Sequence, residues 1–217
     1  MASRDSLNNL WAELLEQKSF AYLVRSKIEQ NLNLVISNIT ASFLGNRQLA
    51  NHNTEDIKYN LEKICEKKFS DGGSIPRDIE LRLLEHRQKL NERLISNSKE
   101  MLEAVTKLQE VHSKIMETNE EVVTFNASII QLSAEMLAND EKFYQDNFKT
   151  KNFKGEFSKI KRGVENSTKA SKKLLEKADT LFKRNLEAQD EIHKKREKIL
   201  KNRARVSDTR KKIKLFL

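Results

Sequence analysis

The sequence predicts an all-α, elongated protein in which long coiled-coil helices follow a small N-terminal helical region. The 217 residues contain one Pro and five Gly, so few positions interrupt a helix. Charged residues make up 34% and hydrophobic residues 37%, which is less apolar than an ordinary globular domain. Apolar residues recur at spacings of three and four over long stretches, the pattern of an amphipathic helix.

Residues 1–70 are predicted to form the N-terminal region, with two helices. The first is expected to end at Gly45, because glycine readily adopts the left-handed conformation that closes many helices. The second is expected to begin at Asn53 or Thr54, which can cap a helix, and to end near Phe69. The Gly-rich segment that follows marks the strongest break in the chain.

Residues 76–147 are predicted to form one long helix that begins at Pro76, a residue suited to a first helical turn. An apolar heptad repeat continues along it with little interruption, so the helix is expected to supercoil against another helix. Its predicted partner-helix seam consists of Leu90, Leu94, Met101, Leu108, Val111, Ile115, Val122, Phe125, Ile129, Leu132 and Met136.

Residues 156–217 are predicted to form a third helix, whose apolar stripe is thinner. The stripe is expected to include Phe157, Ile160, Val164, Leu174, Ala178, Leu181, Ala188, Ile192, Ile199, Val206, Ile213 and Phe216. Polar residues at the remaining sites of the stripe weaken packing and favour a fixed register.

Charge is unevenly distributed along the chain. Residues 1–70 carry nine basic and eight acidic side chains, a net charge of +1; residues 71–147 carry nine and 15, a net charge of −6. Residues 148–217 carry 23 and nine, a net charge of +14. In one interpretation, the acidic and basic helices fold back and pair antiparallel. In the other, the surplus positive charge is kept for an anionic partner.

The C-terminal segment, residues 194–217, concentrates the positive charge. Nucleic acid or an acidic protein surface is a possible partner, with a two-part nuclear import signal and an ordinary solvated face as alternatives. The candidate anion-binding residues are Lys194, Lys195, Arg196, Arg203, Arg205, Arg210, Lys211 and Lys212.

Aromatic and apolar side chains near the N-terminus form a second candidate site. They widen the apolar face beyond what one neighbouring helix covers, so they belong either to a small bundle of the first two helices or to a surface that docks another subunit. The candidate docking residues are Leu7, Leu10, Trp11, Leu14 and Phe20.

No arrangement of residues suggests catalysis. The four His lack the spacing of a helical zinc site, and Cys65 has no histidine near it in sequence. We expect no enzyme activity, metal, cofactor or small-molecule substrate. One Cys, no secretory signal and no membrane span favour an intracellular protein, nuclear or cytoplasmic.

These features favour a structural or scaffold subunit that acts by helix–helix docking with other coiled-coil subunits or with itself. The composition resembles that of coiled-coil subunits of chromosome, kinetochore, spindle or tethering complexes, an assignment that would place the chain with the chromosome or the cytoskeleton. A nucleic-acid- or chromatin-binding protein that uses the basic C-terminus is the alternative, and a membrane-surface-binding helical dimer is a second one.

Overall fold

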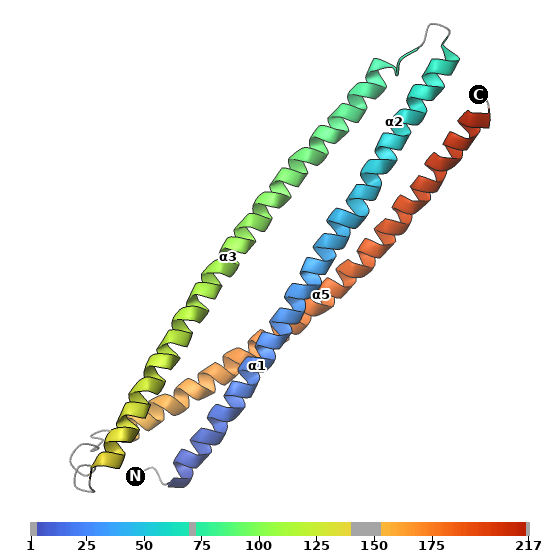
Figure 1. The fold of residues 1–217 in the computed structure, drawn as a ribbon. Helices are drawn as coiled ribbons and strands as arrows, with labels where there is room; N and C mark the ends of the chain where they lie inside the picture. The colour runs from blue at the N-terminus through green and yellow to red at the C-terminus, as the bar shows by residue number, and fades with distance from the viewer. Residues whose placement is uncertain (1–3, 70–72, 140–152, 216–217) are drawn as a thin grey trace. The chain divides into compact units, whose positions relative to one another are not determined.

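The computed structural model describes residues 4–69, 73–139 and 153–215, and these residues are all-α (Figure 1). The elements are α1 (Arg4–Thr40), a π-helix η1 (Ala41–Arg47), α2 (Gln48–Lys68), α3 (Arg77–Ala138) and α5 (Phe153–Leu215). They belong to two compact units: unit 1 comprises Met1–Ile75 and Asn152–Leu217, and unit 2 comprises Pro76–Lys151.

The elements α1, η1 and α2 form one uninterrupted helical segment of 65 residues. The predicted helix end at Gly45 and the predicted new start at Asn53 are therefore both wrong. Gly45 lies inside η1 without a left-handed backbone, and Gln48, which follows η1, has φ −60° and ψ −45°. The helical segment continues through Gly45 and Asn53 because its packing against α5 overrides these weak local preferences.

The helix α5 packs along this segment in a parallel orientation. Asn31 Nδ2 donates to the backbone oxygen of Ala178 (2.8 Å), and Asn60 Nδ2 donates to that of Val206 (3.1 Å). Because the donor and acceptor numbers rise together, the two helices run in the same direction. One charge interpretation expected an antiparallel acidic partner for α5, whereas its partner within unit 1 is the N-terminal helical segment.

Five asparagines make equivalent bonds to α5, and we call them the asparagine row. Its members are Asn31, Asn38, Asn46, Asn53 and Asn60, and their acceptors are the backbone oxygens of Ala178, Asn185, Ile192, Ile199 and Val206. The acceptors are always seven residues apart, but Asn38 and Asn46 are eight apart. The sequence separation of donor and acceptor accordingly falls from 147 to 146 between them.

The π-helix η1 accommodates this extra residue. It occupies residues 41–47, so it begins after Asn38 and contains Asn46, the third member of the asparagine row. A π-turn contains one residue more than an α-helical turn, so it restores the row to the face that contacts α5. The role of η1 is therefore to keep α1 and α2 in register with α5.

The inward face of α5 differs in part from the predicted stripe. Leu174 and Leu181 are exposed (49% and 51%), whereas their neighbours Leu175 and Phe182 are half-buried. Lys27 of α1 lies over the Phe182 ring, 5.7 Å from its centroid. The sequence contains two adjacent apolar rows on α5, and either could have faced the partner helix. Only the position of that helix shows which row is inward.

Unit 2 is described by α3, which contains 62 residues and no buried side chain. The helix begins directly after Pro76, whose carbonyl accepts hydrogen bonds from the N–H groups of Ile79 (3.0 Å) and Glu80 (3.2 Å). The predicted start at Pro76 is therefore right to within one residue. The predicted extension beyond Asn139 falls on residues outside the described part of the chain.

Deletion of Gly45 tests the role of η1. We expect this deletion to make the asparagine row strictly heptad and to convert η1 to an α-helix, because no extra residue then remains. The free energy of unfolding should stay within about 1 kcal/mol of the parent value or rise.

Deletion of Gln30, which lies between Val24 and Asn31, is the matched control. It rotates everything before it by about 100° against α5. The free energy of unfolding should fall by roughly 2–4 kcal/mol, measured by urea denaturation followed by circular dichroism. Equal losses for the two deletions would contradict the register role of η1.

Candidate docking site at the basic end of unit 1

The asparagine row fixes which residues of unit 1 meet. Its five side chains are buried, with exposed fractions of 4–8%. Asn31 Oδ1 accepts a further bond from Asn185 Nδ2 (3.0 Å), and Asn60 Oδ1 accepts one from Arg210 Nε (3.4 Å). The Oδ1 atoms of Asn46 and Asn53 are buried without a partner in the described part of the chain. Each such atom costs about 1–3 kcal/mol, so the row favours one register over maximal stability.

Parallel packing brings the C-terminal ends of α2 and α5 together. The last turn of α2 contains Lys67 and Lys68, and the last turn of α5 contains Lys212 and Lys214. Cations stabilise the negative end of a helix dipole, which gives each pair of lysines a structural role. Together they also create a common positive surface at this end of unit 1. The contribution of α2 to this positive surface was not predicted from the sequence, because its lysines lie about 145 residues before those of α5.

Arg210 joins the two helices at this end. Its Nη2 atom lies 2.6 Å from Asp56 Oδ1, and its guanidinium lies over the Tyr59 ring, 4.9 Å from the centroid. The guanidinium therefore has partners on α2 through charge, hydrogen bonding and ring stacking. Of the predicted anion-binding residues, Arg210 is the one that the structure engages most fully within the chain.

The other predicted anion-binding residues divide into two groups. Arg196 and Arg203 precede Arg210 by fourteen and seven residues, so they share its heptad position. Arg196 lies against Gly45 of η1, with its Nη1 atom 3.5 Å from where a Cβ atom on Gly45 would be. The remaining residues occupy other positions around α5 and are exposed: Lys194, Lys195, Arg205, Lys211 and Lys212. The ion pairs of Lys195 with Glu191 (3.6 Å) and of Lys211 with Asp208 (4.0 Å) are long and exposed, so they hold these side chains weakly.

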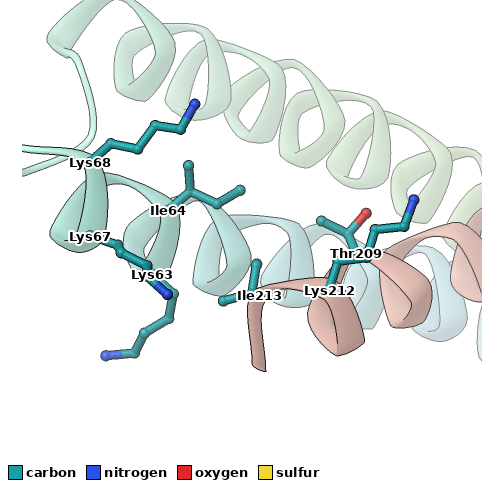
Figure 2. A pocket seen from close by; sticks show the side chains of 7 residues that line it. All are labelled: Lys63, Ile64, Lys67, Lys68, Thr209, Lys212 and Ile213. Carbon is teal, nitrogen blue, oxygen red and sulfur yellow. The ribbon is translucent and has the colours of Figure 1, made fainter. Parts of the chain in front are cut away.

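A groove opens between α2 and α5 at the basic end (Figure 2). It has a volume of about 470 Å³ and is lined by Lys63, Ile64, Lys67, Lys68, Thr209, Lys212 and Ile213. A second groove of about 400 Å³ shares Lys63, Lys67 and Ile213 with it and extends to Tyr59 and Arg210. The apolar lining of the first groove comes from the two isoleucines, the threonine methyl group and the aliphatic parts of the lysines.

Lys63 differs from the other lysines of the groove. Its Nζ atom hydrogen-bonds to Glu66 Oε2 at 2.6 Å. This bond, together with the attraction of the carboxylate, raises the pKa of Lys63 above its ordinary value. Lys67, Lys68 and Lys212 form no ion pair with another described residue. Among the described residues, these three ammonium groups have no acidic partner and can meet an external anion.

The N-terminal docking residues are divided by the structure. Leu10 is buried (6% exposed), and Leu14 and Phe20 are half-buried. Trp11 is 66% exposed and Leu7 is 36% exposed. Three of the five thus contribute to packing within the chain, and the tryptophan remains available to another molecule.

A double-mutant cycle on Arg210 and Asp56 measures how strongly the basic end is held together. The variants Arg210→Ala, Asp56→Ala and the double variant should give a coupling free energy of about 0.5–1.5 kcal/mol in urea denaturation. The short distance favours a value above that of a typical surface pair, and the partial exposure limits it. The Lys211 and Asp208 pair is the control and should give about 0–0.5 kcal/mol. Equal coupling for the two pairs would contradict the assigned role of Arg210.

The described residues contain no group of three or more His, Cys, Asp or Glu side chains that could hold a metal ion. No helix in the same ranges is both long and apolar enough to cross a membrane. Cys65 is buried.

Comparisons of the chain with protein-family models, with curated proteins and with solved structures find no match.

Proposed function

We propose that this protein is a non-enzymatic structural subunit of a multi-protein assembly and that it acts by helix–helix docking. Its partners are other coiled-coil subunits or a second copy of the chain. The observation that carries the proposal is the apolar surface that α3 exposes along nearly its whole length.

Two apolar rows follow α3 at seven-residue intervals. The first contains seven of the eleven predicted seam residues, Leu94, Met101, Leu108, Ile115, Val122, Ile129 and Met136. The second, which was not predicted from the sequence, begins one residue later and is interrupted once, by Gln109; it consists of Ile95, Leu102, Met116, Val123, Ile130 and Leu137. Leu108 is 50% exposed, Val122 53% and Leu137 90%. Continuous apolar surface of this extent is typical of an interaction site.

The face of α3 partly resembles the face of α1 and α2 that binds α5. In unit 1, apolar residues follow Asn31 and Asn46 three and four positions later, namely Leu34, Val35, Leu49 and Ala50. In α3, a polar row is flanked in the same way by the two apolar rows. That polar row, which Val105 interrupts, includes Asn91, Ser98, His112, Asn119, Asn126 and Ser133. The likeness supports docking of a partner helix on α3 in the way that α5 docks in unit 1.

The outer face of α1 and η1 offers a further surface. Trp11, Leu15, Tyr22, Ile36 and Phe43 are 45–66% exposed and follow one another at helical spacings. Large aromatic side chains often anchor protein interfaces. We propose that this surface, with Trp11 as its anchor, receives another subunit.

The regular spacing of contacts also supports a finer description of unit 1. The acceptors of the asparagine row recur every seven residues over 28 residues of α5. A seven-residue repeat is the period of left-handed supercoiling. We infer that α1, η1, α2 and α5 form a parallel coiled coil, and that elongated coiled-coil geometry underlies docking of the partners.

Substitution in the first apolar row of α3 tests the proposal. Leu108→Asp or Ile115→Asp places a charge in the docking face, so each should abolish self-association or weaken binding to captured subunits by about tenfold or more. Analytical ultracentrifugation of the full chain, alone and with those subunits, measures the effect.

Ser113→Asp is the matched control, because it adds the same charge on the polar side of the same helical turn. Circular dichroism should show unchanged helix content in all three variants. Association that survives both Leu108→Asp and Ile115→Asp would rule out α3 as the docking helix.

Nucleic-acid binding is the second candidate function, and the exposed basic residues of α5 favour it. Lys194, Lys195 and Arg205 carry positive charge on the outside of unit 1. Contacts of such residues with phosphates release counterions, so the binding constant would fall steeply with salt concentration.

Charge reversal tests this candidate. Lys194→Glu combined with Arg205→Glu should reduce the slope of log binding constant against log salt concentration by about two, since each phosphate contact contributes about 0.9. Lys107→Glu combined with Lys114→Glu on α3 provides the control. Fluorescence anisotropy with a labelled DNA duplex measures both. Identical slopes for the two double variants would exclude α5 as the contact surface.

A further inference from the structure

The groove at the basic end of unit 1 combines an apolar floor with a positive rim. Figure 2 shows Ile64 of α2 and Ile213 of α5 between the lysines of the two helices. The rim consists of Lys67 and Lys68 on one helix and Lys212 on the other, all exposed. Apolar side chains flanked by cations that have no ion pair within the described residues match an occupant that is apolar along its centre and acidic along its edges.

The floor of the groove continues the interface between the two helices. Asn60 of α2 bonds to the backbone oxygen of Val206 of α5 (3.1 Å). Ile64 follows Asn60 by four residues, and Ile213 follows Val206 by seven. The second groove shares Lys63, Lys67 and Ile213 with the first, so the pair offers apolar surface on both sides of its seam. Ridges of a third helix pack into a depression of this kind between two helices.

We propose that this groove binds an acidic amphipathic helix of a partner protein. The apolar ridge of that helix lies against Ile64 and Ile213, and its carboxylates pair with Lys67, Lys68 and Lys212. The inference rests on the proposed docking function and names the chemistry of one partner. It concerns unit 1, whereas the principal docking face of the proposed function is on α3.

Two other anionic partners fit the groove less well. The phosphates of a nucleic acid match the lysines, but a duplex backbone has no apolar ridge to cover the isoleucines. A lipid bilayer presents a broad anionic surface that would attract exposed lysines anywhere on α5. The position of apolar residues between the lysines of the two helices therefore favours the helix.

The test uses the full chain and a fluorescein-labelled synthetic peptide of about 21 residues, long enough to form a helix of several turns. The peptide has a Leu and Ile stripe flanked by Glu, and fluorescence anisotropy measures its binding. Lys67→Glu combined with Lys212→Glu should weaken binding by about tenfold or more, because attraction is replaced by repulsion.

The matched control is Lys173→Glu combined with Lys183→Glu, two exposed lysines far along α5 from the groove. This variant has the same net charge as the groove variant and should bind the peptide as the parent does. Equal weakening by the two variants would overturn the proposal, because it would show attraction to the total charge of the chain. Circular dichroism confirms that both variants keep their helices.

Three comparison ligands separate the possible partners. A peptide with the same glutamates but Ser in place of the apolar stripe should bind about tenfold more weakly, and equal binding would overturn the proposal. Vesicles with 30% phosphatidylserine and a 20-base-pair DNA duplex complete the set. If the groove variant loses affinity for either of them but not for the peptide, the groove is not a helix site.

One further measurement separates this inference from the proposed function. Leu108→Asp leaves the groove intact and should leave peptide binding unchanged, even where it abolishes association through α3. If peptide binding fails while association through α3 persists, the groove assignment alone is wrong.

Discussion

Hydrogen bonds from buried asparagines to the backbone of α5 are the interaction on which unit 1 depends. An amide side chain reaches a carbonyl of the facing helix only when the two helices lie close and at one relative offset. The five members of the asparagine row apply that condition repeatedly, at offsets of 147 and then 146 residues. Direction, register and the meeting of the two basic ends follow from it. A seam of leucines alone would allow neighbouring registers at a similar free energy.

Few side chains of unit 1 are deeply buried. No side chain of the described chain is fully buried, and two asparagine oxygens lack partners. Much apolar surface is left on α1 and α3 instead, where it remains available to other molecules. Such a distribution suits a component whose folding energy is completed on assembly. It also explains why polar residues inside the seam are acceptable, since they select one pairing at a cost that partners can offset.

The helical segments were predictable because their signals are local: Pro76 marks the start of α3, and apolar spacing marks its face. The continuous helix through Gly45 was not predictable from local signals, because a helix covered by a neighbour tolerates glycine. A signal for the pairing was nevertheless present. Asparagines at positions 31, 38, 46, 53 and 60 repeat at intervals of seven and eight, and the single interval of eight coincides with η1. The groove needed the structure, since its lysines come from distant parts of the chain.

The π-helix also has a mechanical consequence. Its hydrogen bonds are less favourable than those of the α-helices on either side, and it occupies seven residues of a segment that is otherwise regular. When tension acts along the first helix, we therefore expect strain to concentrate in η1. Asn38 before η1 and Asn53 after it can keep their hydrogen bonds to α5 while this turn stretches or twists. The long helical segment thereby gains one more deformable turn, and the position of that turn is set by the one extra residue between Asn38 and Asn46.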